Sequence, residues 1–404
     1  MMNKKSLEIY VHIPFCARKC AYCDFLSFSG NECVQRDYTE KLIEEIEHQS
    51  AYAKEYQVVS IFIGGGTPSI LKTEDMEAVL NALRTQFDIH PHAEVTMEAN
   101  PGTVTQEGLL SYRNAGVNRI SMGLQSADDK ELRYLGRIHT YDAFLKSYQR
   151  VRMAGFDNVN VDLISAIPGQ TVESWKNTLK KVTMLKPEHI SAYSLIIEEG
   201  TPFYDRYGDH VEMESYAMTK EERRQLMALP DLPDEDSERE MYYLTQEFLL
   251  EQGYERYEIS NYTKKGYECR HNIGYWTGME YLGLGLGASS YMNGCRFHNT
   301  TDLNDYRNAR FDQEEGFHHA LRQEYERLSI EEKMEEYMFL GLRLTEGVSA
   351  HGFVSNFGQN IRNVYGPILD RLEQDGLMEF KDGFYRLTSR GIDLSNYVMS
   401  QFLQ

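Results

Sequence analysis

The feature that most constrains this chain is a cysteine triplet, Cys16, Cys20 and Cys23, which follows an apolar run in a C-x3-C-x2-C spacing. Three thiolates this close in sequence can hold one face of a cubane iron–sulfur cluster, whose four iron corners usually take four cysteines. No fourth cysteine stands at a usual spacing, so one iron is expected to stay open for another ligand. Structural zinc also takes four ligands, and a zinc knuckle is the alternative interpretation.

Short apolar runs rich in β-branched residues alternate with helical patterns from residue 7 to about residue 197. Repeated βα units of this kind predict a parallel sheet with right-handed crossovers. Six units fit an α/β fold with an open three-quarter (β/α)6 barrel, in which the loops after the strands carry the chemistry. The six expected strands are Leu7–Phe15, Val58–Ile63, Glu94–Glu98, Arg119–Leu124, Val159–Ser165 and His189–Ile197.

Glycines and polar side chains stand at the ends of these expected strands. Gly64, Gly65 and Gly66 follow the second strand, where glycine lets the backbone approach a ligand closely. No Lys-Ser/Thr pair follows them, which excludes a Walker-type phosphate loop. Singly, each polar residue would be an ordinary satisfied or surface group, but together they are expected to ring one cavity. The polar ring consists of Glu98, Gln125, Arg137 and Asp162, and Tyr10 is expected to project into the same cavity.

The triplet, with the aromatic Tyr22 before its last cysteine, resembles that of radical S-adenosylmethionine (SAM) enzymes, in which SAM binds the open iron. Over nearly the whole chain, the motifs resemble those of the oxygen-independent coproporphyrinogen III oxidase-like radical SAM proteins. The shared motifs are Ile13–Cys16, Gly64–Pro68, Glu98–Pro101, Arg119–Ser126, Asp162, Pro168–Gln170, Tyr257–Asn261 and Leu387–Gly391.

The resemblance implies one [4Fe–4S] cluster held by Cys16, Cys20 and Cys23, with SAM beside it. It also implies that the Glu98 carboxylate accepts hydrogen bonds from the ribose hydroxyls of SAM. One departure lies at the end of the fifth strand, where Ser165-Ala166 replaces an aromatic residue followed by glycine. The positions that match SAM contacts are Tyr10, Tyr22, Gly66, Thr67, Glu98, Gln125, Arg137 and Asp162.

The family has two branches, which two sequence features distinguish. The oxidase branch decarboxylates coproporphyrinogen III and carries a further cysteine two residues after the triplet, where this chain has Phe25. The other branch resembles heme chaperones and is marked by H-N-x-x-Y-W, present here from His271 to Trp276. The resemblance therefore implies a heme chaperone. An oxygen-independent coproporphyrinogen III oxidase, and a radical SAM enzyme with another substrate, are the alternatives.

Within this motif, His271 is the expected axial ligand of heme iron, because neutral imidazole is a common one. Tyr275 and Trp276 are expected to line the porphyrin, whereas Cys269 is a rival ligand. A structural turn with a buried tryptophan is the alternative interpretation of the motif. Heme and the client proteins that receive it are the expected partners.

The composition narrows the remaining classes. The 404 residues carry a net charge of -20, which argues against nucleic acid as the main partner. No signal-peptide core and no run of 18 apolar residues is present, so a cytoplasmic protein without a membrane span is expected. In a reducing compartment the six cysteines are ligands or free thiols. Outside the triplet, Cys33, Cys269 and Cys295 are expected to be small buried or partly buried residues.

Changes in pattern after Gly200 predict three domains. The charged stretch 210–236 is expected to be an exposed excursion that leads into a helix. Helices over Glu331–Leu344 and Ile361–Asp375, and a hairpin over Leu377–Leu387, predict a smaller C-terminal helical, winged-helix-like domain. The predicted domains are residues 1–205 (partial barrel), 206–300 (barrel extension with the proposed heme motif) and 301–404 (C-terminal domain).

Overall fold

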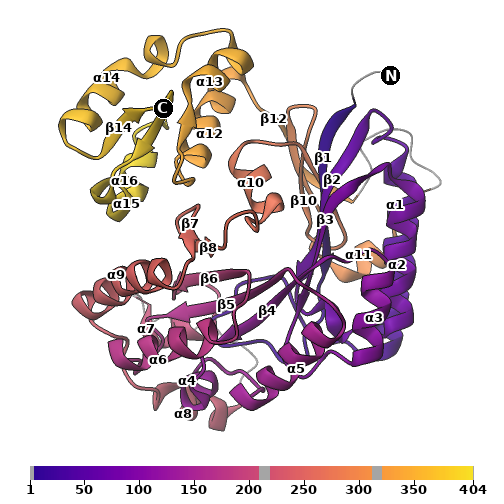
Figure 1. The fold of residues 1–404 in the computed structure, drawn as a ribbon. Coiled ribbons are helices and arrows are strands. Elements are labelled where there is room, and N and C mark those ends of the chain that lie inside the picture. Colours follow the sequence, from indigo (N-terminus) through magenta and orange to yellow (C-terminus); the bar gives the residue numbers. More distant parts are fainter. Residues whose placement is uncertain (1–3, 209–218, 312–320, 404) are drawn as a thin grey trace.

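The computed structural model describes residues 4–208, 219–311 and 321–403 and shows an α/β protein built on one large sheet (Figure 1). This sheet has twelve strands in the order β12-β11-β10-β9-β1-β2-β3-β4-β5-β6-β8-β7, and a separate sheet has three strands. Among the described helices, none combines the length and apolar character that a membrane crossing requires.

The first six strands form the parallel centre of the large sheet in sequence order, which confirms the predicted open barrel. The third strand begins five residues earlier than predicted, because Ile89 pairs with Val58 although its neighbours are polar. The six strands are β1 (Lys5–Ile13), β2 (Tyr56–Gly65), β3 (Ile89–Ala99), β4 (Arg119–Gln125), β5 (Val159–Ser165) and β6 (His189–Ser194).

Helices cover the outer face of this parallel centre (Figure 1). Most begin at a side chain that accepts a backbone N–H of the first turn, such as Asn31, Thr105 and Thr171. Their apolar faces pack on the strands to form the main hydrophobic core. The helices are α1 (Glu32–Ser50), α2 (Thr73–Gln86), α3 (Gln106–Asn114), α4 (Asp129–Tyr134), α5 (Tyr141–Met153) and α6 (Val172–Thr183).

Later segments extend the sheet at both edges. β8 (Asn261–Thr263) pairs antiparallel with β6 on one side and with β7 (Glu255–Arg256) on the other. At the opposite edge, β9 (Tyr281–Leu284) pairs parallel with β1. Antiparallel strands complete the second edge, namely β10 (Ser289–Met292), β11 (Cys295–Asn299) and β12 (Arg322–Arg327).

Helices fill the connections of this extension. α7 (Pro202–Tyr207), α8 (Lys220–Met227) and α9 (Glu235–Glu251) follow the sixth strand. Of the predicted excursion, residues 210–218 lie outside the described residues, and the rest contains α8 and the start of α9. α10 (Arg270–Trp276) carries the H-N-x-x-Y-W motif, and α11 (Leu303–Asn308) packs on α1.

The C-terminal module has its own hydrophobic core, from Met334 to Phe402. The predicted hairpin is present, and its turn places Asp382 and Gly383 at positive φ (54° and 89°). The three-domain division stays a prediction. Within the predicted C-terminal domain, β12 pairs with the large sheet. The module contains α12 (Ile330–Gly341), β13 (Val348–Ser349), α13 (Ala350–Phe357), α14 (Ile361–Gln374), β14 (Met378–Lys381), β15 (Phe384–Leu387), α15 (Ser389–Asp393) and α16 (Ser395–Ser400).

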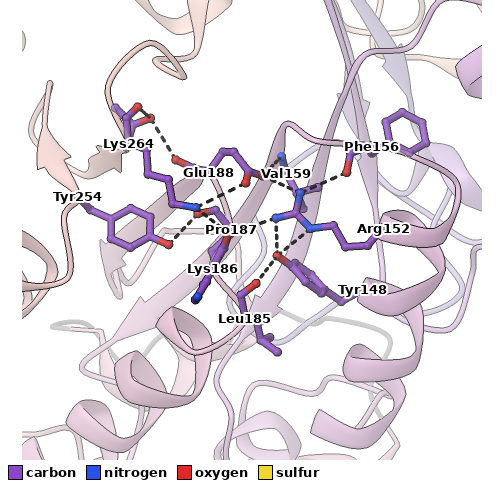
Figure 2. A network of polar contacts seen from close by, with 11 residues as sticks. Tyr148, Arg152, Phe156, Val159, Leu185, Lys186, Pro187, Glu188, Tyr254 and Lys264 are labelled. Carbon is purple, nitrogen blue, oxygen red and sulfur yellow. Dashed lines mark hydrogen bonds and ion pairs between the residues drawn. The ribbon is translucent and has the colours of Figure 1, made fainter.

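A polar network holds the amino ends of β5 and β6, opposite the strand ends that carry the predicted site (Figure 2). The Glu188 carboxylate contacts Arg152 at 2.7 Å and Lys264 at 3.5 Å. The Tyr254 hydroxyl donates to the Pro187 carbonyl at 2.7 Å. These contacts tie α5 and the turn after β8 to the base of the barrel.

Candidate functional site

A cavity of about 410 Å³ opens at the carboxyl ends of the parallel strands. This is where the βα pattern places the chemistry of a parallel barrel. The predicted residues that line the cavity are Cys16, Cys20, Tyr22, Cys23, Gly66, Thr67, Glu98, Gln125, Arg137 and Asp162. Tyr10 and His271 are not among the lining residues.

The three cysteines sit in a loop anchored to the end of β1. The Cys16 N–H donates to the Phe28 carbonyl at 3.0 Å, and the Cys23 N–H donates to the Cys20 carbonyl at 3.2 Å. Burial raises the pKa of Cys23 to about 11, and the charges of the Cys20 and Cys16 thiolates add to this effect. The three thiols are free, and bound iron would stabilise them as thiolates.

The glycine loop after β2 is hydrogen-bonded to the segment that leads into the cysteine loop. Gly66 N–H donates to the Ile13 carbonyl and Thr67 N–H to the Phe15 carbonyl, each at 2.8 Å. A Cβ at Gly66 would lie 2.7 Å from the Phe15 carbonyl oxygen, so only glycine fits beside the triplet. The Thr67 hydroxyl lies 3.4 Å from the Cys16 sulfur.

These features fit an iron–sulfur cluster with one open iron, because three cysteines of one cavity face a close-packed glycine loop and a cationic Arg137. In the described part of the chain, no three His, Cys, Asp or Glu side chains are placed to hold a single metal ion.

Two carboxyl groups line this cavity, Glu98 from β3 and Asp162 from β5, on either side of β4. Glu98 accepts a hydrogen bond from Gly65 N–H at 3.1 Å. Burial, together with the nearby charge of Asp162, raises the pKa of Glu98 to about 8. Asp162 is held differently, because it accepts hydrogen bonds from Ser121 at 3.0 Å and from Asn160 at 2.8 Å.

Arg137 reaches from the loop after α4 to the cysteine loop. Its guanidinium donates to the Asn100 side-chain oxygen at 2.8 Å and to the Cys20 sulfur at 3.6 Å, and it also contacts the Gly123 carbonyl. Asn100 in turn donates to the Thr67 hydroxyl at 2.7 Å. Asn100 lies in the same motif as Glu98, but no sequence signal predicted its contact with Arg137.

Two residues at strand ends adopt left-handed backbone conformations that non-glycine residues rarely take. Gln125 ends β4 with φ of 71°, and Ala166 follows β5 with φ of 59°. Such strain collects at binding sites, where the surrounding structure holds it. Ala166 occupies the position where the resemblance expects glycine, and it adopts the left-handed backbone conformation that glycine favours.

Tyr10 lies on β1 and is not among the residues that line the cavity, where it was expected to project. Its hydroxyl hydrogen-bonds with His12 Nδ1 at 3.1 Å, and its ring stacks on Phe62 at 6.4 Å between centroids. Burial and the charge of Glu98 raise the pKa of Tyr10.

His271 lies apart from the cavity, with 1% of its surface exposed. Its Nδ1 lies 2.8 Å from the Ser60 hydroxyl and its Nε2 lies 3.0 Å from the Tyr275 hydroxyl. Burial lowers the pKa of His271 to about 3, so the imidazole is neutral. Both ring nitrogens are engaged, and neither is available to heme iron in this arrangement. The rival Cys269 is also buried, with its sulfur 3.5 Å from Glu94.

The rest of the H-N-x-x-Y-W motif joins α10 to its neighbours. The Tyr275 ring packs edge-on against Tyr281 at 4.7 Å, and the Arg343 guanidinium lies 4.3 Å above the Trp276 ring. α10 therefore contacts both β2 of the barrel and α12 of the C-terminal module (Figure 1).

Comparison with known proteins places this architecture in a family. The model of the "Radical SAM superfamily" matches residues 10–182, and that of the "HemN C-terminal domain" matches residues 328–394. The chain is similar along its length to proteins named "Heme chaperone HemW". It is 36% identical to that of Lactococcus lactis subsp. lactis (100% of this chain, 98% of the relative) and 32% identical to that of Escherichia coli (100% of both).

A solved structure of coproporphyrinogen III oxidase (HemN) from Escherichia coli has the same fold. The two share a TM-score of 0.80 at 22% identity, over 99% of this chain and 90% of the oxidase. Family membership implies SAM and a [4Fe–4S] cluster. The triplet, the cavity and the relatives that match along the chain all support one assignment. The chain belongs to the heme chaperone branch of the oxygen-independent coproporphyrinogen III oxidase-like radical SAM family.

Proposed function

We propose that this protein is a heme chaperone that binds heme and a [4Fe–4S] cluster with SAM, and that transfers heme to client proteins. Phe25 carries the proposal. It lines the cavity, is 68% exposed and stands where the oxidase branch has a cysteine. A phenyl ring neither ligates metal nor transfers a proton, so the chain lacks the oxidase's group at this point. The full-length relatives named heme chaperones support the same function.

In this proposal Cys16, Cys20 and Cys23 hold the cluster, and the cavity binds SAM beside it. A reduced cluster with SAM supplies one-electron chemistry. The chain's own residues bind and orient: Glu98 accepts from the ribose hydroxyls, and Arg137 balances negative charge at the cluster. The residues proposed for SAM are Tyr10, Tyr22, Gly66, Thr67, Glu98, Gln125, Arg137 and Asp162.

His271 as the heme ligand stays a prediction, and the structure adds a condition to it. The Tyr275 hydroxyl occupies Nε2, so iron binding requires that this hydrogen bond break and that α10 expose the imidazole. Because the bond competes with iron for one lone pair, removing it should favour the heme complex.

The function is tested on protein reconstituted anaerobically with its cluster. We expect saturable heme binding in a spectroscopic titration, heme transfer to an apo-hemoprotein, and no coproporphyrinogen decarboxylation with SAM and reductant. Formation of protoporphyrinogen at repeated turnover would establish the oxidase alternative instead.

The ligand is tested by two variants with opposite expected effects. His271→Ala should shift or remove the Soret band, whereas Tyr275→Phe should keep the band position and strengthen heme binding. His351→Ala, at an exposed histidine of α13, is the matched control. A heme spectrum and affinity unchanged by both variants would exclude His271 as the ligand.

A further inference from the structure

A series of buried and partly buried hydrogen bonds runs from α10 to Asp162 in the cavity. The N–H of Cys269, the N-cap residue of α10, donates to the Tyr257 hydroxyl at 3.3 Å. That hydroxyl lies 2.9 Å from His189 Nε2, and His189 Nδ1 lies 2.7 Å from the Asn160 side-chain oxygen. The Asn160 amide then donates to the Asp162 carboxylate at 2.8 Å.

The direction of these bonds follows from the chemistry of their members. An amide oxygen only accepts, so His189 Nδ1 carries the proton and Nε2 accepts from the Tyr257 hydroxyl. His189 is fully buried, and burial lowers its pKa well below the usual value, which matches a neutral imidazole. Every donor therefore points toward Asp162, and donors in series polarise one another.

Ser121 and Ser191 add further hydrogen bonds around Asn160 and Asp162. The Asn160 amide also donates to the Ser121 hydroxyl at 2.8 Å, and Ser121 donates to Asp162 at 3.0 Å. The Ser191 hydroxyl donates to the Asn160 oxygen at 3.2 Å, so turning the amide over would lose four hydrogen bonds, two at its oxygen and two at its nitrogen. Asp162 thus accepts hydrogen bonds from Asn160 and Ser121, and the other hydrogen bonds of these two residues fix their orientation.

Asp162 needs this support because of its surroundings. Burial raises its pKa, and a carboxyl group is usually neutral when it is desolvated beside another carboxyl group. The donors from Asn160 and Ser121 favour the ionised form and so offset part of the effect of burial on this pKa. The charged and titratable groups around it are Glu98 on β3, Arg119 on β4, Tyr193 on β6, Arg137 after α4 and Tyr22 in the cysteine loop.

We propose that Tyr257, His189 and Asn160 are positioning residues that hold Asp162 ionised and aimed into the cavity, where it faces the cationic SAM. The inference rests on the SAM-binding role proposed for Asp162. Tyr257 selects the His189 tautomer, which holds the Asn160 amide in the orientation that donates. Without the Tyr257 hydroxyl, the other tautomer becomes accessible, the amide turns its oxygen toward Asp162, and the carboxylate takes up a proton.

Tyr257→Phe and His189→Phe test this chain of bonds in the cluster-loaded protein. At pH 6.5 we expect each to weaken SAM binding by roughly tenfold in calorimetry, the scale of outer-shell hydrogen-bond partners. The ratio of variant to wild-type dissociation constants should approach 1 by pH 9, because Asp162 then ionises without support. Iron and sulfide content and heme binding should not change.

Tyr254→Phe is the matched control, since its hydroxyl donates to Pro187 in the network of Figure 2 and not to this chain of bonds. It should bind SAM like the wild type at every pH. A ratio of 1 at every pH, a loss that does not depend on pH, or the same loss in the control would overturn the inference. Wild-type protein that binds heme but no SAM would overturn the SAM part of the proposed function, and the inference with it.

Discussion

At the scale of single residues, the cavity contains two half-buried carboxyl groups with different hydrogen-bond partners. Burial raises the pKa of Glu98 to about 8, and a backbone N–H is its one protein hydrogen bond among the described residues. Asp162 instead receives side-chain donors that favour its charge. Burial therefore favours the neutral acid at Glu98, whereas at Asp162 the side-chain donors offset part of the effect of burial.

The titration of Glu98 predicts a pH-dependent SAM affinity. The ionised carboxylate is the better acceptor for ribose hydroxyls, and its population rises as the pH passes through 8. We expect the SAM dissociation constant to fall between pH 6.5 and pH 9, and Glu98→Gln to flatten this dependence. Glu98→Ala should weaken binding by roughly 1.5–3 kcal/mol, the scale of a hydrogen bond to a charged group. Calorimetry that shows a flat wild-type profile would contradict this role.

The cysteine triplet makes a second residue-scale prediction. Cys16→Ser, Cys20→Ser and Cys23→Ser should each lose the brown cluster absorption, because two thiolates hold a cubane poorly. Cys33→Ser is the control, since Cys33 is an exposed free cysteine of α1 outside the cavity. Analysis of iron and sulfide checks the result, and full cluster content in the Cys20 variant would refute the assignment.

At the scale of elements, α10 connects the two parts of the protein. Its His271 side chain contacts Ser60 of β2, and its Trp276 ring packs under Arg343 from the C-terminal module. The Thr345 N–H of that module donates to the Tyr257 carbonyl at 3.0 Å. The segment around Tyr257 thus contacts the barrel interior, the start of α10 and the C-terminal module.

Two glycines of the C-terminal module should respond differently to alanine. A Cβ at Gly391 in α15 would overlap the Leu377 carbonyl, so Gly391→Ala should lower the free energy of unfolding by roughly 1–3 kcal/mol. Apart from its chain neighbours and its own helix backbone, nothing lies within 4 Å of a Cβ at Gly366 in α14. Pro367 follows it and disfavours a helical residue with a Cβ, which offsets the helix propensity of alanine, so Gly366→Ala should change the free energy of unfolding little. Chemical unfolding measures both, and equal effects would contradict the packing around Gly391.

At the scale of the whole molecule, buried carboxyl groups couple stability to pH. Burial raises the pKa of Glu8 to about 8, although Ser60 donates to one of its oxygens. Its other oxygen has no hydrogen-bond partner among the described residues. A carboxyl group whose pKa is raised by folding binds more protons in the folded state, so its ionisation opposes folding.

We therefore expect the free energy of unfolding to fall as the pH rises from about 5 to 9, a window that spans the unfolded and folded pKa values of Glu8 and Glu98. Glu8→Gln should reduce this slope, because it removes one of the ionisations that oppose folding. Glu55→Gln, at an exposed position before β2, is the control. Urea unfolding at several pH values checks the sign, and a stability that rises over this window would contradict it.

Local patterns in the sequence were enough to predict the parallel centre and most of the cavity. The βα period places Glu98, Gln125 and Asp162 at successive strand ends, and the cysteine spacing brings three thiols into one loop. Such features depend on residues close in sequence and on the geometry that parallel strands share. The confirmed barrel and the composition of the cavity lining follow from them.

Only the tertiary structure decided what depends on contacts between distant segments. β9 pairs with β1 across more than two hundred residues, and no local period predicts that pairing. The motif at His271 was expected at a heme site, yet α10 packs the imidazole between Ser60 and Tyr275, away from the cavity. The hydrogen bonds from Tyr257 to Asp162 likewise join three separate segments. Sequence patterns constrain secondary structure and ligand spacing, whereas the partners of a buried polar group are set by the packing of the whole chain.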